Sequence, residues 1–352
     1  MSSTKPPCFV CATPSITRCS QCKVIHYCSS ACQRKDWPRH KVACTPAGKP
    51  SPTLESATTT TTTTTSNKGS TSSTSTKIPV DPSKPLKLTP VEHDPSSDLK
   101  PEPLASSTKL KFKFEHSQDG IDLNLLIFFH GLGDKIEPNF VQLAKSLNLP
   151  QTATVCIQAP TAVPFLEEAG WQWFPSFNIM TGELLGPEHK ERITQVKQVV
   201  RPELVKFVQH CIDHSKFPAN NIMLFGFSQG AQIALDLAAF GGIPLRGVVS
   251  IAGYMMEESE NEEPANKKSM TKILVMQGDK DDLRSVKDAK EKLKHLERIF
   301  GKANVQQLIV DGMGHGMPNS EAGWRPLMEF FAMSLHHRAI AMEKMADVYE
   351  VK

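Results

Sequence analysis

Between residues 109 and 337, short apolar runs alternate with longer amphipathic stretches. The apolar runs have the length of strands and few polar positions, which is typical of strands buried on both faces of a parallel sheet. They predict strands at residues 109–115, 125–129, 154–157, 222–225, 248–251, 273–276 and 305–310. The amphipathic stretches predict helices at residues 138–147, 188–214, 231–240, 286–300 and 322–337, with Pro202 breaking or kinking the longest one. The alternation predicts an α/β domain in which helices cover both faces of a mainly parallel sheet.

The rest of the chain has a different composition. Residues 49–108 contain no Phe, Trp or Tyr and include an unbroken threonine run at 58–65. Such a segment cannot bury enough apolar surface to offset the entropy of ordering it, so we predict a disordered linker there. The predicted parts are a cysteine-rich module at 1–48, the linker at 49–108, the α/β domain at 109–337 and a C-terminal tail at 338–352.

Charge and hydropathy narrow the class of protein. The 352-residue chain has a net charge of only +3, which gives no general argument for nucleic-acid binding. Residues 1–50 hold eight Lys or Arg and one acid, Asp36, for a net +7, while the remainder carries −4. Residues 1–7 are polar, and no apolar run approaches the roughly 20 residues of a membrane span. We therefore expect no membrane span and a cytoplasmic or nuclear location.

A serine motif stands at the end of one predicted strand. Gly226-Phe227-Ser228-Gln229-Gly230 follows the strand at 222–225 and precedes the helix at 231–240. This pattern is typical of a sharp strand-to-helix turn that exposes a serine hydroxyl above a sheet, and glycines permit such a bend. It predicts a serine hydrolase with Ser228 as the nucleophile.

A serine nucleophile needs a base within hydrogen-bonding reach and a carboxylate that orients the base. Asp279, Asp281 and Asp282 follow the predicted strand at 273–276, and His315 follows the strand at 305–310. The chain order serine, acid, histidine is that of α/β-hydrolases, and parallel sheets place their sites at the carboxyl ends of strands. His315 is the predicted base, and the three aspartates are alternative orienting acids.

The oxyanion of such a reaction needs backbone N–H donors. One donor is the N–H after the nucleophile, that of Gln229. The other comes from a loop after an early strand, and His130-Gly131-Leu132-Gly133-Asp134 directly follows the strand at 125–129. Glycines in this loop free the backbone to aim an N–H, and Leu132 would supply it.

Five ordered motifs resemble the acyl-protein thioesterase / phospholipase-carboxylesterase family. They are His-Gly-Leu-Gly-Asp at 130–134, Trp-Phe at 173–174, Gly-Phe-Ser-Gln-Gly at 226–230, Gly-Asp-x-Asp at 278–281 and Gly-Met-Gly-His at 312–315. The resemblance implies an α/β-hydrolase fold, with Ser228 as nucleophile, Asp281 as orienting acid and His315 as base. It also implies Leu132 and Gln229 as oxyanion donors and Trp173 as a substrate-binding residue. The implied reaction is hydrolysis of acyl thioesters or carboxylic esters without a cofactor.

The chain departs from that family's pattern near the site. Asp282-Leu283-Arg284-Ser285 stands where the family has proline and a Val-Pro pair, and Pro175 replaces an aspartate after the Trp-Phe motif. An acidic stretch at 257–263 follows the predicted strand at 248–251. We interpret this stretch as a solvated surface loop, with a lid at the site entrance as the alternative.

Metal ligands crowd the amino-terminal module. Seven of the nine cysteines lie between residues 8 and 44 and, with one histidine, form four pairs: Cys8 and Cys11, Cys19 and Cys22, Cys28 and Cys32, His40 and Cys44. Clustered thiols in a reducing compartment indicate metal binding rather than disulfides. Because zinc takes four such ligands, the eight predict two structural zinc ions, although thiolates also suit iron. Metal binding would supply the folding free energy that so small a module lacks.

The same spacing resembles the MYND zinc finger over residues 8–44, with Tyr27-Cys28 and Cys32-Gln33-Arg34-Lys35-Asp36-Trp37 ahead of the histidine. The resemblance implies interleaved sites, with Cys8, Cys11, Cys28 and Cys32 on one ion and Cys19, Cys22, His40 and Cys44 on the other. It also implies recognition of proline-rich protein partners in a groove lined by Gln33 and Trp37. The basic charge of the module would also suit nucleic acid. We regard nucleic-acid binding as the weaker alternative, because the sequence shows no recognition helix.

The combined prediction is a serine hydrolase joined to a two-zinc, peptide-binding finger. Its expected substrate is an acylated protein or a small ester. The alternative from another class is an adaptor that binds partners through the finger and uses the hydrolase fold only as a scaffold.

Overall fold

The structure is a computed structural model that describes two long ranges, 98–265 and 270–339. It also describes the backbone of 88–90 and 349–351, and residues 8, 10–11, 13–14, 17–19, 25–29, 31–33 and 36 of the cysteine-rich module. The chain divides into two compact units, Met1–Asp81 and Pro82–Lys352. Among the described residues, no helix is long and apolar enough to cross a membrane.

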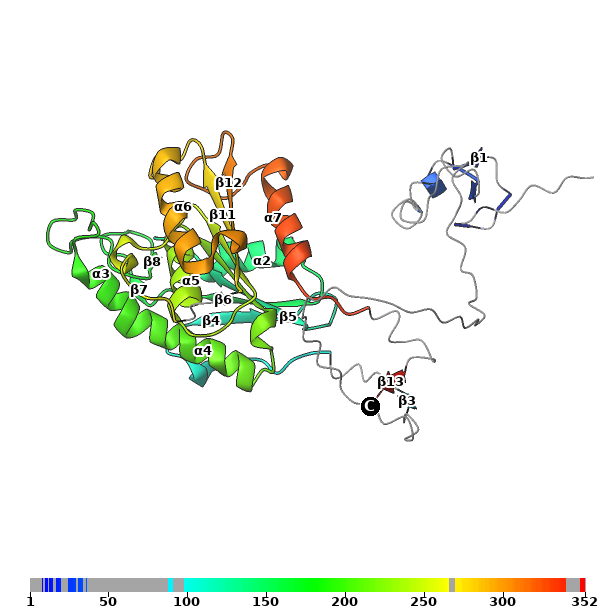
Figure 1. Ribbon diagram of the computed structural model, residues 1–352, viewed down its shortest axis with the longest axis horizontal. Helices are drawn as coiled ribbons and strands as arrows, with labels where there is room; N and C mark the ends of the chain where they lie inside the picture. The colour runs from blue at the N-terminus through cyan, green and yellow to red at the C-terminus, as the bar shows by residue number, and fades with distance from the viewer. Residues whose placement is uncertain are drawn as a thin grey trace, which may run out of the picture. The chain divides into compact units, whose positions relative to one another are not determined.

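A seven-stranded sheet forms the centre of the second unit, with the strand order β12-β11-β10-β9-β5-β6-β4 (Figure 1). The strands are β4 Phe112–Glu115, β5 Asn124–Phe129, β6 Thr152–Ile157, β9 Ile222–Phe227, β10 Gly247–Ile251, β11 Lys272–Gly278 and β12 Val305–Val310. All neighbours are parallel except β4, which runs antiparallel to β6 at one edge. The predicted mainly parallel α/β sheet is therefore confirmed.

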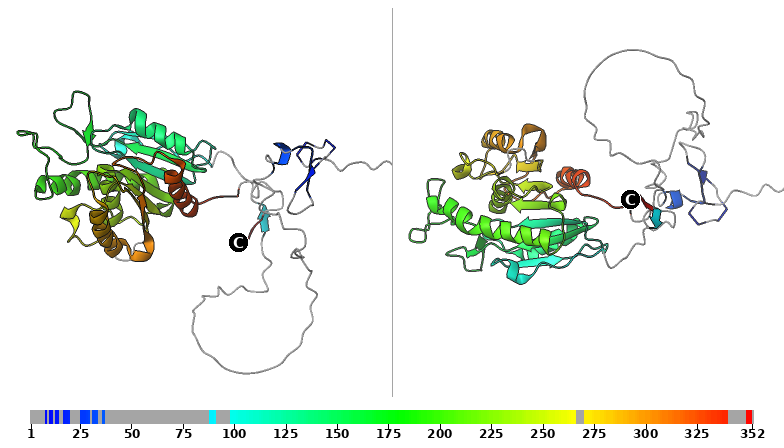
Figure 2. Two further views of the ribbon diagram at one scale, coloured as in Figure 1. Left: turned by 90° about the horizontal axis from the view of Figure 1, so that it is seen from above. Right: turned by 60° about the horizontal axis from the view of Figure 1, so that its bottom comes forward.

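Helices cover both faces of this sheet (Figures 1 and 2). They are α2 Val141–Leu147, α3 Lys190–Gln195, α4 Arg201–Asp213, α5 Gln229–Phe240, α6 Val286–Phe300 and α7 Glu321–Ser334. Successive side chains of a strand point to opposite faces. Leu125 and Ile127 accordingly join a core with residues of α4, α5 and α6, whereas Leu126 and Phe128 join a second core with residues of α2 and α7. The strands read as continuous apolar runs because both faces are buried.

The predicted helix at 188–214 is continuous in its backbone. Between α3 and α4 lies a single π-helical turn, η4 Val196–Val200, and the residues at each junction keep helical backbone angles. Pro202 stands in the first turn of α4. It lacks the N–H that would bond to a carbonyl one turn earlier, and the wider π turn gives its ring room. The expected disturbance at Pro202 is thus a π turn and not a break.

Several short elements were not predicted. The strands β7 Thr161–Ala162 and β8 Trp171–Gln172 form an antiparallel pair. By contrast, η3 Ile136–Phe140 leads into α2 and overlaps the start of the helix predicted at 138–147. The 3-10 turns are η2 Ala105–Ser107, η5 Ala219–Asn221, η6 Glu257–Ser259 and η7 Lys302–Asn304. Two small ladders pair β1 Thr17–Arg18 with β2 His26–Tyr27, and β3 Leu88–Pro90 with β13 Tyr349–Val351. Strands of two or three residues are too short to leave a periodic signal in the sequence.

The packed domain begins earlier than the predicted boundary at residue 109. Leu104 N donates to His210 Nε2 of α4 at 3.1 Å, and Thr108 Oγ1 donates to Glu203 Oε2 of the same helix at 3.1 Å. Asp98 forms an ion pair with Arg338 at 2.8 Å. Residues 98–108 are therefore part of the domain and not of a disordered linker. They attach through polar and backbone groups, which a count of apolar residues does not register.

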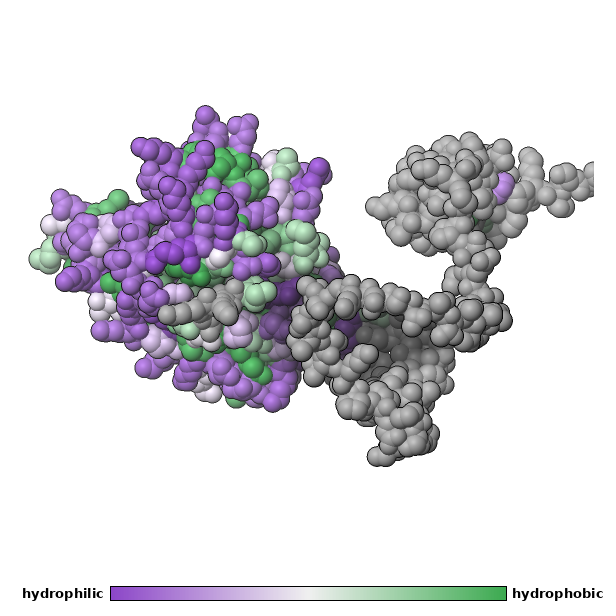
Figure 3. Space-filling model, in the orientation of Figure 1, coloured by the Kyte–Doolittle hydropathy of each residue, from purple (hydrophilic) through white to green (hydrophobic). Residues whose placement is uncertain are grey.

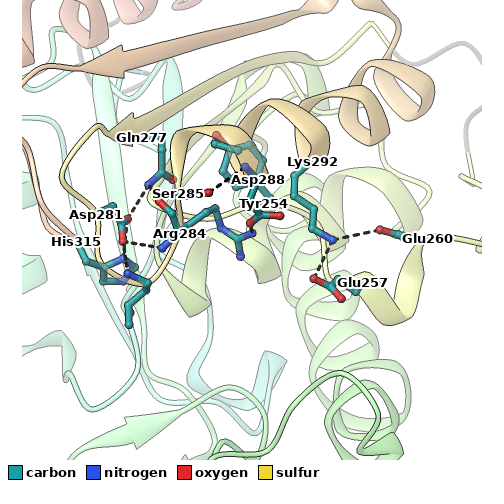
Figure 4. A network of polar contacts seen from close by, with 12 residues as sticks. Tyr254, Glu257, Glu260, Gln277, Asp281, Arg284, Ser285, Asp288, Lys292 and His315 are labelled. Atoms are coloured by element: carbon teal, nitrogen blue, oxygen red, sulfur yellow. Dashed lines mark hydrogen bonds and ion pairs between the residues drawn. The ribbon is translucent and has the colours of Figure 1, made fainter.

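The acidic stretch after β10 is held on two sides by cations. Glu258 pairs with Arg192 of α3 at 2.8 Å, and Glu262 pairs with Arg201 of α4 at 2.6 Å. On the other side, Lys292 of α6 pairs with Glu257 at 2.8 Å, as Figure 4 shows. The stretch thus links α3 and α4 to α6. It is bonded to its neighbours rather than solvated on all sides.

Arg201 is expected to be the most important cation of this link. It donates to both carboxylate oxygens of Asp236 at 2.7 Å, and the Asp236 side chain is 2% exposed. Burial raises the pKa of Asp236 even against the opposing bonds from Arg201. Arg201→Ala would leave this buried carboxylate without a counter-charge, so the free energy of unfolding should fall by about 3–5 kcal/mol in urea titrations.

The matched control is Arg325→Ala. Arg325 pairs with Glu321 at 3.2 Å within α7, and both side chains are more than half exposed. Exposed ion pairs contribute little, so this variant should stay within about 0.5 kcal/mol of the wild type. Equal losses in the two variants would contradict the role given to Arg201.

Candidate active site

Ser228 lies in the tight turn between β9 and α5. Its backbone angles, φ 51° and ψ −115°, lie outside the regions that L-residues ordinarily occupy. A side chain at Gly226 would collide with the backbone of the following helix, and one at Gly230 would collide with the carbonyl oxygens of Phe129 and His130. The two glycines of the motif therefore let α5 approach both β9 and the loop after β5.

Three loops at one edge of the sheet bring the predicted serine, histidine and aspartate together. His315 follows β12, and its Nε2 lies 2.9 Å from Ser228 Oγ. Asp281 follows β11, and its Oδ2 lies 2.9 Å from His315 Nδ1. Because the parallel strands all end at this edge, residues separated by up to 87 positions form one chain of hydrogen bonds.

Asp281 is the one of the three alternative acids that contacts His315. Its side chain is fully buried, Oδ1 accepts from the N–H of Leu283 at 2.9 Å, and Oδ2 accepts from Gln277 Nε2 at 2.7 Å. Burial alone would raise the pKa of this carboxyl, but the bonds from His315 and Gln277 outweigh it and lower the pKa. The stabilisation from these bonds is thus present above the ordinary carboxyl pKa and is lost as the pH falls through the lower folded-state value.

The other two acids lie elsewhere. Asp279 Oδ1 accepts from the N–H of Gly312 at 2.6 Å, so it holds the turn that carries His315. Asp282 is exposed.

Sequence reasoning missed Gln277, the last residue but one of β11. Figure 4 shows Gln277, Asp281 and His315 side by side. Gln277 is fully buried and donates to the same carboxylate oxygen that His315 contacts. It therefore helps to orient Asp281. A glutamine in an apolar strand gives no sign in the sequence of which loop it will contact.

The loop after β5 is held rigidly around His130. The His130 ring is fully buried, and its Nε2 accepts from the N–H of Ala159 at 3.0 Å. Its Nδ1 must then carry the proton that it shares with Gly131 O at 2.7 Å. Burial lowers the pKa of His130, in agreement with a neutral ring. His130 thus shapes the loop and is unavailable for proton transfer.

Two backbone N–H groups near Ser228 are free to donate. Gln229 is the first residue of α5, where helical geometry provides no acceptor for its N–H. Within 98–265 and 270–339, no hydrogen bond is recorded for the N–H of Leu132. Leu132 and Gln229 both line a cavity of about 260 Å³ beside Ser228. The predicted oxyanion donors therefore lie at the site.

The predicted substrate-binding role of Trp173 is wrong, because its side chain cannot contact a substrate in this structure. The residue is completely buried, its Nε1 donates to His130 O at 2.9 Å, and its backbone N–H donates to Gln229 Oε1 at 2.6 Å. The ring packs against Phe129 and His130. Trp173 thus supports the loop and the start of α5 from inside. Its neighbour Phe174 lines the cavity instead.

Four cysteines of the first unit form a separate cluster. The Sγ atoms of Cys8, Cys11, Cys28 and Cys32 all lie within 4.8 Å of one another. The separations from Cys28 are 3.4 Å to Cys11 and 3.5 Å to Cys32. Four thiolates at about 2.3 Å from one zinc in a tetrahedron lie about 3.8 Å apart, so this cluster fits a zinc ion.

The second predicted zinc set is only partly described. Cys19 is buried next to Cys8 and Tyr27, whereas Cys22, His40 and Cys44 lie outside the described residues. Of the predicted groove residues, Gln33 is half-buried and Trp37 lies outside the described residues. This ligand set and this groove stay predictions.

Comparisons with known proteins agree with the two-part organisation. The family described as Phospholipase/Carboxylesterase matches residues 116–330, and the MYND finger matches residues 8–44. An uncharacterised hydrolase of Mycosarcoma maydis is 36% identical over 166 residues, which cover 44% of this chain and 60% of that protein. Acyl-protein thioesterase 1 of Debaryomyces hansenii is 28% identical over 202 residues, which cover 56% of this chain and 85% of that protein.

A solved structure shows the same fold. The crystal structure of esterase PE8 matches with a TM-score of 0.53 and 24% identity, covering 64% of this chain and all of that one. The Phospholipase/Carboxylesterase match spans more than half of the 352 residues. The chain therefore belongs to the phospholipase/carboxylesterase family of hydrolases, and it carries a MYND finger ahead of its hydrolase domain.

Proposed function

We propose that the second unit hydrolyses acyl thioesters or carboxylic esters through Ser228, His315 and Asp281. The observation that carries the proposal is the chain of two 2.9 Å hydrogen bonds from Ser228 Oγ through the His315 ring to Asp281 Oδ2. Asp281 accepts a hydrogen bond from the N–H at Nδ1 of His315 and thereby leaves the lone pair of Nε2 pointing at the serine hydroxyl. That arrangement activates a hydroxyl group that is otherwise a poor nucleophile.

The reaction then proceeds in two halves. His315 takes the proton of Ser228 as Oγ attacks the acyl carbonyl, and returns it to the departing thiolate or alkoxide. The N–H groups of Leu132 and Gln229 stabilise the oxyanion. Water then attacks the acyl-serine as His315 takes its proton. His315 returns this proton to Ser228 Oγ when the bond from Oγ to the acyl carbon breaks and the carboxylic acid leaves. The similarity to acyl-protein thioesterase 1 supports thioesters among the substrates.

A fluorophosphonate probe tests the proposal directly. Such a probe labels an activated serine covalently, so the full-length protein should be labelled and should then lose its hydrolysis of p-nitrophenyl esters and acyl-thioester peptides. A wild-type protein that is neither labelled nor active would favour the alternative, an adaptor with the hydrolase fold as scaffold.

For the finger, we propose a targeting role with two structural zinc ions. Cys8, Cys11, Cys28 and Cys32 would hold one ion and Cys19, Cys22, His40 and Cys44 the other. A groove lined by Gln33 and Trp37 would bind a proline-rich protein partner. Recruitment of this kind raises the local concentration of a substrate near the hydrolase. The proposed reaction at Ser228 uses no cofactor.

Zinc content is the measurable consequence. Mass spectrometry of the native protein should find two zinc ions per chain, and Cys28→Ala should retain one, because it removes a ligand of the described cluster. Chelation of both ions should unfold the finger and abolish peptide binding, since metal binding supplies its folding free energy. The control is Cys211→Ala: this buried cysteine of α4, whose pKa burial raises to about 12, should leave the zinc content unchanged. One zinc ion in the wild type would contradict the two-site proposal.

A further inference from the structure

The cavity beside Ser228 is small and contains polar groups. It measures about 260 Å³, which is below the roughly 300–1,000 Å³ of most small-molecule pockets. Its apolar lining comes from Leu132, Phe174, Leu184 and Leu185, and its polar lining beyond the serine turn comes from Ser176, Arg192 and Gln232. Ser176 is already committed, because its Oγ accepts from Gln229 Nε2 at 2.9 Å. Arg192 and Gln232 are the remaining polar side chains that could bind a substrate group in the cavity.

Gln232 lies one helical turn after the nucleophile. Its N–H donates to Ser228 O at 3.3 Å, so its side chain follows that of Ser228 on the same side of α5. The side-chain oxygen Oε1 is buried and has no hydrogen-bond partner among the residues that the structure describes. A buried acceptor without a partner is unfavourable, and a substrate group that donates a hydrogen bond there would satisfy it.

Arg192 contributes a fixed donor group whose positive charge is balanced by Glu258. Its Nε donates to Glu258 Oε1 at 2.8 Å, its Nη1 donates to Leu185 O at 2.5 Å, and its guanidinium lies 4.9 Å from the Phe174 ring centre. Within 98–265 and 270–339, no bond is recorded for its Nη2. Because Glu258 balances the charge, the cavity suits a neutral polar group better than a carboxylate. The acidic stretch after β10 thus determines the chemistry of the cavity through Glu258.

We propose that this cavity is a specificity subsite for a short, neutral, hydroxyl-bearing group of the substrate, with Gln232 as its hydrogen-bond acceptor and Arg192 as its donor. The volume of about 260 Å³ suits a short group. The proposal rests on the proposed function, because it concerns the substrate of the same serine. The hydroxyl belongs either to the acyl group or to the leaving group.

Two matched pairs of esters distinguish these sources. The acyl pair is p-nitrophenyl 3-hydroxybutanoate and p-nitrophenyl butanoate. The leaving-group pair is 2-hydroxyethyl butanoate and propyl butanoate. In one of the pairs, the full-length wild type should show kcat/KM at least about tenfold higher for the hydroxylated member, since a buried polar group discriminates strongly against an analogue that leaves it unpaired.

Gln232→Leu should bring this ratio to about 1, and the ratio cancels any general loss of activity in the variant. Gln209→Leu is the control, because Gln209 is exposed on α4 and should keep the wild-type ratio. Fluorophosphonate labelling of Gln232→Leu shows that the variant is folded at Ser228. Two outcomes would overturn the subsite while Ser228-dependent butanoate hydrolysis continued. One is a wild type that prefers the hydroxylated ester in neither pair, and the other is a preference that survives Gln232→Leu. Absence of any Ser228-dependent hydrolysis would overturn the proposed function together with the subsite.

Discussion

Replacing Ser228 with alanine is expected to lower kcat for ester or thioester hydrolysis by about 10⁴- to 10⁶-fold. The substitution removes the oxygen that lies 2.9 Å from His315 Nε2 and that acts as the proposed nucleophile. Binding and oxyanion stabilisation by Leu132 and Gln229 would remain, so a small residual rate over the uncatalysed reaction is expected. Steady-state kinetics with p-nitrophenyl esters measures the loss.

The matched control is Ser146→Ala. Ser146 is an exposed serine of α2 whose Oγ donates to Gln142 O at 2.8 Å. This variant should keep wild-type kcat/KM and full fluorophosphonate labelling, whereas Ser228→Ala should lose the label. Retention of more than about a tenth of the wild-type kcat in Ser228→Ala would show that another group performs the reaction.

Asp281→Asn is expected to lower kcat by about 10³- to 10⁴-fold with a small change in KM. The amide can present its N–H₂ group to His315 Nδ1, which favours the tautomer that carries its proton on Nε2. That proton would then point at Ser228 Oγ and prevent His315 from acting as a base. The variant is nearly isosteric, so the free energy of unfolding serves as a check that the fold is intact.

The two neighbouring aspartates provide the internal comparison. Asp282→Asn changes an exposed side chain and should leave kcat within about twofold of the wild type. Asp279→Asn weakens the bond to the N–H of Gly312 and should give an intermediate loss through the turn that carries His315. If Asp279→Asn or Asp282→Asn were the most damaging of the three, the assignment of Asp281 would be wrong.

The elements of the sheet were predictable because burial on both faces leaves a continuous apolar signal. The β7–β8 pair left none, since two residues cannot show a period. The early part of the domain at 98–108 also escaped detection. Its contacts are single polar bonds, such as that from Leu104 N to His210, and composition does not encode them.

Sequence motifs identified the reaction groups, and the family resemblance favoured Asp281 among the three aspartates. Ser228 and His315 follow from a turn pattern and from chain order. Residue order alone leaves Asp279, Asp281 and Asp282 as alternatives, because it does not give the direction of each side chain. The fold adds that direction, and Asp281 is the one that contacts His315. Trp173 was expected to face the substrate, yet it is buried against His130. An aromatic residue beside a functional loop can support the loop from inside as readily as it can line the site.

The ion pair between Asp98 and Arg338 determines the boundaries of a stable recombinant hydrolase domain. This ion pair and two hydrogen bonds hold the carboxyl-terminal segment: the N–H of His336 donates to Asn124 Oδ1, and the N–H of Arg338 donates to Gln151 Oε1. Asn124 and Gln151 stand at the amino ends of β5 and β6, whereas the loop that contains Leu132 leaves the carboxyl end of β5. A recombinant fragment should therefore run from 98 to 339 and not begin at 109. Immobilised on a surface by either end, such a fragment would present the Ser228 edge to solution.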